Sequence, residues 1–377
     1  MADSNYPPIA LLVQTDLHYA RQVALGVHRF FAQRMDAPPV AMVPTGRLSH
    51  QTFRRRLTKC SGVVGFASKD DAVHARRRRL PTVIVNTAMR GDYARVVPDH
   101  AAVGRQAAEH LLAQGHRRVA IMAYRHPSPW EQRYRALQQA VTASGGMVTR
   151  IHWTGDATAQ LAAALGQVTA AFAPTDRDAQ RLIDVASQLG LNVPADLAVM
   201  GADDDTFLCE MSAVPLTSVD LQPRRIGYAA AEHLWNAIQN GSLEPTVVRV
   251  PPRGVTVRRS TDALAYEDPN VRTAMRMIQR HACEEMTIDT VMEGLTISRR
   301  TLETRFRQDV GRTLLQEIHR VRFDRATHLL VHSDLPVKEI ARRCGYPDHC
   351  RFSTQFRRRF GVPPSAYRLE RRVRGQQ

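Results

Sequence analysis

Residues 299–311 read RRTLETRFRQDVG, and residues 349–361 read HCRFSTQFRRRFG. The two segments share an apolar residue at every fourth position and a final glycine: Leu302, Phe306, Val310 and Gly311 correspond to Phe352, Phe356, Phe360 and Gly361. Apolar residues four apart form one face of a helix, and glycine often caps the C-terminus of a helix. The repeat therefore predicts two similar helices near the end of the chain, each with one buried face.

A shorter helix is expected before each repeated helix. Thr287 to Glu293 leads through a turn to Ser298, and Val337 to Arg343 leads through a turn to Asp348; Ser298 and Asp348 are residue types that begin helices as N-caps. Between the two pairs, one helical face is predicted to pack against both and contains Leu314, Leu315, Ile318, Val321, Ala326 and Leu329. The pattern predicts an all-α domain with two helix-turn-helix motifs.

This segment resembles the DNA-binding domains of the AraC type. The resemblance is carried, in order, by Ile297-Ser298-x-x-x-Leu302-x-x-x-Phe306, Arg322-x-x-x-Ala326-x-x-Leu329-Leu330, Ile340-Ala341-x-x-Cys344-Gly345-Tyr346 and Phe356-x-x-x-Phe360-Gly361-Val362-Pro363-Pro364-x-x-Tyr367-Arg368. Thr296 departs from the family, which often has glycine at this turn position, and a residue with a Cβ is disfavoured where φ is positive. The resemblance implies two motifs that enter successive major grooves of DNA.

The residues expected to face DNA lie on the sides of the two repeated helices that carry no apolar stripe. They are Arg299, Arg300, Glu303, Thr304 and Arg307 in the first helix, and His349, Cys350, Arg351, Thr354 and Gln355 in the second. Arg300, Glu303 and Thr304 also match base-contacting positions of the family. Arginine can pair with guanine and glutamate can accept from cytosine, although each arginine has the alternatives of a phosphate contact or a solvated face. Arg357 to Arg359 are expected to bind phosphate.

The charge distribution favours a polyanionic partner for this part of the chain. The formal net charge is +16, and residues 269–377 hold 22 Lys and Arg against 12 Asp and Glu, which is +10 of that total. Arginine supplies nearly all of the positive charge. Arginine suits bidentate contacts to phosphate and guanine, but a genomic base composition rich in arginine codons explains the bias equally well.

From Ile9 to about Val257, short apolar runs alternate with amphipathic stretches. The predicted strands are Ile9–Val13, Gly62–Phe66, Thr82–Val85, Val119–Met122, Ala170–Ala173 and Leu197–Met200, and the predicted helices are Arg21–Gln33, Ala102–Gln114, Trp130–Ser144, Asp178–Leu189 and Arg225–Asn240. Alternating strands and helices indicate a parallel sheet with crossover helices. About 250 residues of this pattern predict two lobes rather than one large sheet.

Three ordered stretches of this region resemble the effector-binding core of LacI/GalR-type repressors. They are Val97 to Met122, Val199-Met200-Gly201-Ala202-Asp203-Asp204, and Pro215-Leu216-Thr217-Ser218-Val219. The resemblance implies an α/β two-lobed fold of the periplasmic-binding-protein-like type I class. We therefore expect a sensor domain over residues 1–260, with a first lobe at about 6–98 and 220–250 and a second lobe at about 99–219. A polar linker at 261–268, which includes Glu267, and a DNA-binding domain at 269–377 should follow.

Candidate ligand residues follow the predicted strands, because ligands of this fold bind beyond the C-terminal ends of strands. They are Asp16, Tyr19, Arg21, Arg133, Thr175, Asp176, Asp203 and Asp204. Carboxylates and arginine can each hold two sugar hydroxyls, and Arg133, Thr175, Asp176 and Asp203 match effector-contacting positions of the LacI/GalR family. The alternatives remain that Asp203 or Asp204 caps the next helix and that Tyr19 belongs to the core.

A LacI-like sensor placed ahead of an AraC-type domain resembles the xylose-operon regulator family. The closest stretches include Tyr19-x-Arg21-Gln22-Val23, Val250 to Val255 and His281-Ala282-Cys283. The resemblance implies D-xylose as effector, activation of xylose-utilisation genes, double-stranded promoter DNA and RNA polymerase as partners, and a homodimer. The residues alone support a small polyhydroxylated ligand, so another pentose or a related sugar as effector, and a sugar-binding protein without regulation, remain alternatives.

Several classes of protein are disfavoured by what the sequence lacks. No targeting signal precedes the apolar run at Ile9 to Val13, no stretch approaches a membrane span, and five cysteines form no Cys-x-x-Cys pair. A cytoplasmic protein is therefore expected, with no membrane association. No nucleophile motif or phosphate loop is present, so we expect a protein that is not an enzyme and needs no cofactor or metal.

Overall fold

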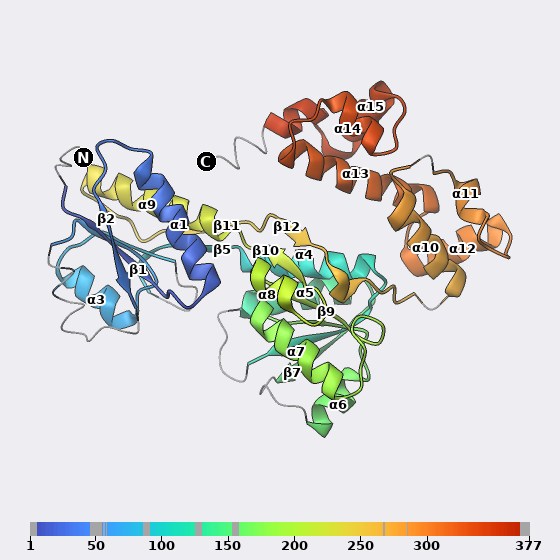
Figure 1. Cartoon of the computed structure of the whole chain (residues 1–377), viewed down its shortest axis with the longest axis horizontal. Coiled ribbons are helices and arrows are strands. Elements are labelled where there is room, and N and C mark those ends of the chain that lie inside the picture. The colour runs from blue at the N-terminus through green and yellow to red at the C-terminus, as the bar shows by residue number, and fades with distance from the viewer. Residues whose placement is uncertain are drawn as a thin grey trace. The chain divides into compact units, whose positions relative to one another are not determined.

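The structure is a computed structural model that describes residues 6–45, 55, 57, 59–85, 91–124, 130–152, 158–266, 268–284 and 286–369. Glu267 and residues 370–377, which the sequence assigned to the linker and the DNA-binding domain, lie outside the described residues. The chain divides into two compact units (Figure 1). The first consists of residues 1–112 and 117–263, and the second of residues 113–116 and 264–377.

The first unit contains a six-stranded parallel sheet built mainly from the N-terminal part of the chain. Its strand order is β11-β5-β4-β3-β1-β2, with β1 at Ile9–Val13, β2 at Val40–Pro44, β3 at Gly62–Gly65, β4 at Thr82–Ile84, β5 at Ala94–Pro98 and β11 at Val247–Val250. The associated helices are α1 (His18–Ala32), α3 (Lys69–Arg77) and α9 (Pro223–Asn240). All five residues of β1 are buried, as expected for a parallel strand covered by helices on both faces.

A second six-stranded sheet forms the other lobe of this unit. Its order is β12-β10-β9-β8-β6-β7, with β6 at Arg118–Ala123, β7 at Met147–His152, β8 at Ala170–Phe172, β9 at Ala198–Ala202, β10 at Thr217–Asp220 and β12 at Gly254–Thr256. Only β12 is antiparallel among the described pairings. The helices are α4 (His100–Ala113), α5 (Glu131–Ala143), α6 (Ala159–Leu165), α7 (Asp176–Gln188), α8 (Thr206–Met211) and the 3-10 helix η1 (Arg259–Thr261).

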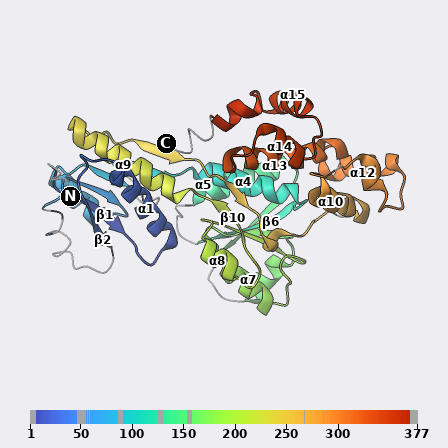
Figure 2. The same cartoon turned by 45° about the horizontal axis from the view of Figure 1, so that its top comes forward.

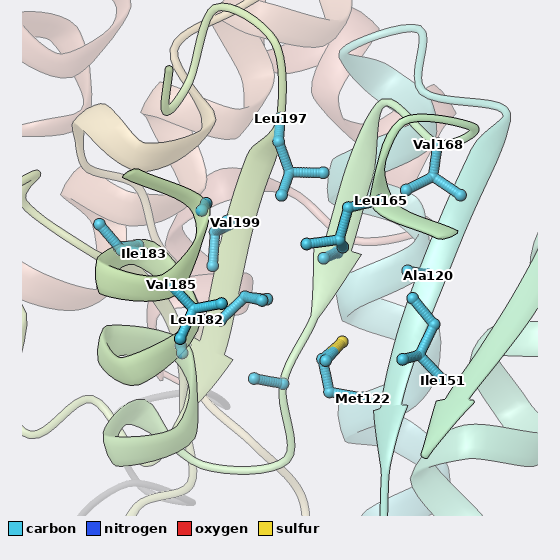
Figure 3. Packing of buried hydrophobic residues seen from close by; sticks show 14 of the residues in the cluster. Ala120, Met122, Ile151, Leu165, Val168, Leu182, Ile183, Val185, Leu197 and Val199 are labelled. Atoms are coloured by element: carbon cyan, nitrogen blue, oxygen red, sulfur yellow. The ribbon is translucent and has the colours of Figure 1, made fainter. Parts of the chain in front are cut away.

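The packing of the second lobe explains why its strands are apolar throughout. On one side of the sheet, Ala120, Met122 and Val199 meet Leu182, Ile183 and Val185 of α7 in a single buried cluster (Figure 3). On the other side, Val119, Ile121 and Met200 pack in a cluster with α4 and α5. All six strands predicted from the sequence are present, as are the five predicted helices, with shifts of a few residues at their ends. The two-lobed α/β prediction is confirmed.

The second unit is helical, as predicted. It contains α10 (Pro269–His281), α11 (Ile288–Met292), α12 (Arg299–Val310), α13 (Leu314–His332), α14 (Val337–Arg343) and α15 (His349–Phe360). One core lies among α10, α11 and α12, and another among α14 and α15; α13 contributes Ile318 to the first and Phe323 to the second. Accordingly, α14 and α15 lie at one end of α13, and α10 to α12 lie at the other (Figures 1 and 2).

One residue predicted for the packed face of α13 is exposed. Leu314 and Ile318 are buried, but Leu315 keeps 50% of its surface exposed. The prediction for Leu315 was wrong because Leu314 and Ile318, four positions apart, already fill the face toward the first core. Leu315 is rotated about 100° from Leu314 and points away from that core.

The segment between η1 and α10 makes a hydrogen bond near each of its ends, through Thr261 and Tyr266. Thr261 is fully buried in the second lobe, where its hydroxyl lies 2.9 Å from the Thr217 hydroxyl. Tyr266 is buried in the core of the second unit and its hydroxyl donates to the carbonyl of Ala113 at 2.8 Å. The chain between these two residues is therefore short and anchored at both ends. Among the described residues, no helix is both long enough and apolar enough to cross a bilayer.

Candidate ligand site and DNA-binding surface

Arg133 is buried in the first unit, with only 1% of its surface exposed. It is the third residue of α5, and its position depends on the crossing of α5 with α4. A Cβ on Gly104 of α4 would lie 2.1 Å from the Arg133 carbonyl oxygen, so only glycine permits this approach. The crossing brings the first residue of α4, His100, against the guanidinium, whose Nε donates to His100 Nδ1 at 2.8 Å. The Nη1 donates to the carbonyl of Pro174 at 2.6 Å.

The charge of Arg133 has no carboxylate partner within ion-pair distance in the described part of the chain. Its nearest side-chain acceptor is an imidazole, and burial together with the Arg133 charge lowers the pKa of His100 to about 2. His100 is therefore neutral and accepts through Nδ1. Burial also lowers the pKa of Arg133 itself, against the opposing attraction of Asp203. A buried guanidinium without a counter-ion is costly, which is a common property of sites that bind a ligand.

Asp203 follows β9 and provides the acidic group of the same region. Its φ is 136°, in the left-handed region that residues with a Cβ rarely adopt, and strain of this kind concentrates at functional sites. Its backbone N–H donates to the carbonyl of Val219, but its carboxyl group makes no hydrogen bond or ion pair with the described residues. Burial, followed by the negative charge of Asp176, raises the pKa of Asp203 well above its ordinary value.

Tyr19 comes from α1 of the first lobe and adds a hydroxyl to this group. The hydroxyl is buried and finds no hydrogen-bond partner among the described residues. Its ring packs edge-on against Phe66, with centroids 6.1 Å apart. Burial, with the charge of Asp203, raises the pKa of Tyr19, whereas the charge of Arg133 lowers it. Three polar groups from three elements and both lobes thus interact electrostatically: Tyr19 and Asp203, whose side chains have no hydrogen-bond partner among the described residues, and Arg133, whose charge has no counter-ion there.

Three other candidates make hydrogen bonds within the protein. Asp176 is fully buried; its Oδ1 accepts from the Ser218 hydroxyl at 2.5 Å, and its Oδ2 accepts from the Asp205 N–H at 2.8 Å. Burial raises the pKa of Asp176 to about 6. Thr175 caps α7, and Asp204 is paired with the Arg258 guanidinium at 2.9 Å. These residues form the frame that holds the β9 and β10 ends together.

The structure leaves the two remaining candidates outside this group. Asp16 is exposed, and exposed Arg21 donates from Nη1 to the carbonyl of Thr15 at 2.8 Å. Sequence reasoning missed His18, whose Nδ1 lies 3.5 Å from Asp205 Oδ1 in the other lobe. The sequence could have indicated His18 and Asp205 because each is next to a candidate residue: His18 precedes Tyr19, and Asp205 follows Asp204. His100 had no such signal, because its role depends on the crossing of α4 and α5.

The predicted DNA-facing residues of α12 are all exposed. Ser298 caps the helix by accepting from the Thr301 N–H, and Leu302, Phe306 and Val310 are buried on the opposite face. Arg299 is ion-paired with Glu303 at 3.0 Å and with Asp289 at 3.4 Å, and Thr304 donates to the carbonyl of Arg300. Arg300 and Arg307 make no such pairs within the described chain. Thr296 is not among the residues with positive φ, so this turn does not need glycine.

The second motif presents a different set of side chains. His349, Cys350, Arg351 and Thr354 of α15 are exposed, and Gln355 is half-buried. Asp348 caps the helix by accepting from the Cys350 N–H at 2.8 Å. The potential ligand atoms of Asp348, His349 and Cys350 lie within 4.8 Å of one another. The apolar faces of α12 and α15 therefore repeat, while their exposed faces differ.

Two family models match the chain in the order of its units. A model described as periplasmic binding protein-like domain matches residues 108–261, and a model described as helix-turn-helix domain matches residues 292–370. The first match runs from within α4 to the end of η1, and the second runs from the end of α11 past α15.

Curated relatives match parts of the chain, and one solved structure matches nearly all of it. The Xylose operon regulatory protein of Escherichia coli (strain K12) is 36% identical over 200 residues, which are 53% of this chain and 51% of that protein. The match thus spans about half the length of the curated relative. The HTH-type transcriptional activator RhaS of Enterobacter sp. (strain 638) is 37% identical over 119 residues, covering 31% of this chain and 43% of that protein. A solved structure of the xylose-binding transcription activator xylR has a TM-score of 0.58 and 27% identity, covering 98% of this chain and 99% of that one.

The fold and the matches define the architecture of this protein: a periplasmic-binding-protein-like domain that precedes a helix-turn-helix domain. Within that architecture, the chain is similar to the xylose operon regulatory proteins over about half of their length, and to the solved xylose-binding transcription activator over nearly the whole chain.

Proposed function

We propose that this protein is a sugar-responsive transcription regulator that binds D-xylose between its two lobes and activates xylose-utilisation genes. Its partners would be double-stranded promoter DNA, RNA polymerase and a second copy of the chain, in the cytoplasm. The relatives named as xylose operon regulatory protein and xylose-binding transcription activator support the choice of sugar. The alternative is the same architecture with another pentose as effector.

The observation that carries the ligand proposal is that, among the described residues, the side chains of Tyr19 and Asp203 have no hydrogen-bond partner and the buried charge of Arg133 has no counter-ion. A guanidinium can donate to two hydroxyls, a carboxylate can accept from two, and a phenol can do either. A small polyol offers hydroxyls in several directions and is neutral, so it can satisfy all three groups without adding charge. Because Tyr19 belongs to one lobe and the other two to the second, a ligand that bonds all three also fastens the lobes together.

The DNA proposal rests on the exposed faces of α12 and α15. One motif presents Arg299, Arg300, Glu303, Thr304 and Arg307, and the other presents His349, Cys350, Arg351, Thr354 and Gln355. These sets differ in charge and hydrogen-bonding type, so the two motifs should recognise different half-sites in tandem. One chain would then cover a site without internal symmetry, and a dimer would cover a repeated pair.

A thermal-shift series across sugars tests the effector. A ligand that binds only the folded state stabilises it by RT ln(1 + [L]/Kd), about 2.7 kcal/mol at 100 times Kd. D-xylose should raise the melting temperature, while L-arabinose, D-ribose and D-glucose at equal concentration should raise it less. A larger shift with another sugar would identify that sugar as the effector in place of xylose, and the proposed role as a regulator would stand. No shift with any sugar would remove the sensor role.

A further inference from the structure

A hollow of about 460 Å³ lies between the two helix-turn-helix motifs of the second unit. Its walls come from the turn after α12, from one side of α13 and from the last turn of α15. The residues that line it with polar side chains are Arg312, Gln316, His319, Arg320 and Arg359. Sites for small molecules have volumes in this range, so the polar groups of the walls determine which chemistry the hollow can bind.

Three guanidinium groups line this hollow, and they come from three different places in the fold. Gly311 ends α12 with a φ of 78°, and Arg312 follows it directly. Arg320 belongs to α13, and Arg359 belongs to the last turn of α15. The Arg359 guanidinium lies 5.7 Å from the centroid of the Phe360 ring and makes no hydrogen bond or ion pair within the described part of the chain. Its N–H donors are therefore available to a ligand.

A buried carboxylate orients the other two guanidinium groups. Glu317 has no exposed surface, and it accepts hydrogen bonds from Arg320 Nε at 2.9 Å, from Arg320 Nη2 at 2.7 Å and from Arg312 Nε. Arg320 Nη1 donates to Asp324 at 2.6 Å. A buried carboxylate is costly unless it is paired and hydrogen-bonded. The pairing uses both oxygens of Glu317, but it leaves the terminal nitrogens of Arg312 without a partner among the described residues.

The uncharged side chains of the lining add further donors. The side-chain oxygen of Gln316 accepts from the Thr313 N–H at 2.9 Å, which leaves the amide N–H groups of Gln316 for another partner. His319 Nδ1 lies 2.9 Å from the Tyr346 hydroxyl, and burial, followed by the charge of Arg322, lowers the pKa of His319. The tyrosine can donate to Nδ1 of this neutral imidazole, which places the imidazole proton on Nε2. The hollow thus offers many donors and few acceptors.

We propose that this hollow binds a phosphate group. Three guanidinium groups are opposed there by the carboxylates of Glu317 and Asp324, which leaves a positive charge in excess. A phosphate is negatively charged and accepts hydrogen bonds in several directions, and arginine matches its oxygens with parallel pairs of N–H groups. Two sources supply this chemistry: the DNA backbone between the two half-sites, and a free phosphorylated small molecule.

A phosphate held in the hollow joins the two motifs. Arg312 follows α12 of the first motif and Arg359 lies in α15 of the second, so one phosphate that accepts from both links the two helices through its own oxygens. The link fixes the spacing of α12 and α15, which favours DNA whose half-sites have the matching spacing. This consequence for DNA rests on the proposed function, whereas the phosphate site itself does not.

The first experiment tests free phosphate with the full chain in the absence of DNA. Inorganic phosphate replaces chloride at constant ionic strength, and the melting temperature is measured. Phosphate also stabilises folded proteins by exclusion from their surfaces, and that part is common to all variants. Wild type should show an additional rise from binding, and Arg359→Gln should lose it. The variant should fold, because Arg359 has no ion pair to lose.

Arg357→Gln is the matched control for this measurement. Arg357 is exposed in the same turn of α15, but it does not line the hollow, so its replacement removes the same charge and should keep the additional rise. If Arg357→Gln loses the rise as completely as Arg359→Gln does, phosphate binds the basic surface in general, and the hollow is not the site.

The second experiment tests the DNA backbone as the source. The duplex that wild type selects from a random pool is made as a series in which one phosphate at a time is replaced by a neutral methylphosphonate. If the DNA supplies the group, one replacement between the half-sites should weaken wild-type binding roughly tenfold. The same replacement should have little effect on Arg359→Gln. Arg357→Gln should keep the tenfold difference between the two duplexes, even where its overall affinity is lower.

The two experiments together decide the proposal. A rise in melting temperature that depends on Arg359 identifies a site for free phosphate, and a methylphosphonate effect that depends on Arg359 identifies the DNA backbone as a source. The proposal is overturned if neither response depends on Arg359. If wild type selects no DNA at all, the proposed DNA-binding function fails instead, and the melting measurement alone decides the phosphate site.

Discussion

Arg133 and His100 share a buried hydrogen bond in which the guanidinium Nε donates to the imidazole Nδ1 at 2.8 Å. A neutral acceptor in this position orients the guanidinium without cancelling its charge. A carboxylate in this position would have oriented the guanidinium and also neutralised its charge, which would have left less driving force for binding a ligand. The pair thus keeps Arg133 fixed in direction, and its positive charge is available to a polar molecule that enters from the lobe interface.

His100 should make the free protein less stable in mild acid. Its folded pKa of about 2 lies below the ordinary value of 6.5, so below about pH 6.5 the unfolded chain binds a proton that the folded chain does not. Stability is therefore fully present above pH 6.5 and falls by up to about 1.4 kcal/mol per pH unit below it. In His100→Asn, whose amide oxygen can replace Nδ1 as acceptor, urea unfolding between pH 5 and 7 should show this part of the slope removed.

The contribution of His100 is obtained as the difference between the wild type and His100→Asn in the free energy of unfolding at each pH. Asp176 and Asp203 have raised pKa values and contribute stability of the opposite sign, lost as pH rises. Both are present in each protein, so their contribution largely cancels in the difference. Parallel pH profiles for the two proteins would show that His100 is not held neutral by its surroundings.

Tyr19→Phe should separate stability from ligand binding. The buried hydroxyl of Tyr19 has no partner among the described residues, and an unsatisfied buried hydroxyl costs about 1–3 kcal/mol. Its removal should therefore leave the sugar-free protein equally stable or about 1 kcal/mol more stable. Xylose affinity, measured by calorimetry, should fall roughly tenfold because one hydrogen bond is lost. A less stable protein with unchanged affinity would instead assign the hydroxyl to the core.

Arg133→Met should abolish the sugar response, with Arg21→Ala as the matched control. Methionine keeps the length of the buried chain but removes the donors, so the xylose-induced rise in melting temperature should disappear. Arg21 is another arginine that the sequence nominated, yet it is exposed and bonded to Thr15, so its removal should leave the shift intact. Affinity for DNA in the absence of sugar should survive both changes. If Arg21→Ala alone lost the xylose-induced rise in melting temperature, the sugar would instead bind near Arg21 in α1.

The sequence predicted strands where burial makes them apolar on both faces. β1, β3, β4, β6, β8 and β9 lie inside the two sheets, and each appeared as a short apolar run. Four of the six missed strands, β2, β7, β11 and β12, are edges, whereas β5 and β10 lie inside the sheets and were missed although they are largely buried. β7 is mostly exposed along its length, so no apolar run marks it. Edge strands are specified by pairing with a neighbour, which local sequence does not record.

The candidate ligand site could likewise be predicted only in part from the sequence. Tyr19, Arg133 and Asp203 were nominated by their positions after strands and by family resemblance, and in the structure the charges of Asp203 and Arg133 both affect the pKa of Tyr19. What sequence could not show is that Asp204 and Asp176 are occupied by Arg258, Ser218 and the Asp205 backbone. Those partners come from segments distant in the chain, so a carboxylate that is free and one that is occupied look alike in the sequence.

Arg300 and Arg358 should affect DNA binding in different ways. Arg300 is exposed on the second residue of α12 and makes no ion pair within the described chain, so it is free to contact a base edge. Arg300→Ala should lower discrimination at one base position by about 1–3 kcal/mol. Arg358, in the last turn of α15, is expected to bind phosphate. Arg358→Ala should weaken all sequences alike and reduce the slope of log K against log salt by about 1.

Arg299→Ala provides the control for the Arg300 experiment, because the two arginines are adjacent but differ in their partners. Arg299 is held by Glu303 and Asp289, so its contribution to base recognition should be smaller, and its loss should release Glu303 rather than remove a donor from the DNA. Selection from a randomised duplex pool with each variant measures the preference at every position. If Arg299→Ala relaxes one base position and Arg300→Ala relaxes none, the ion pair opens on binding and Arg299 is the residue that contacts the base.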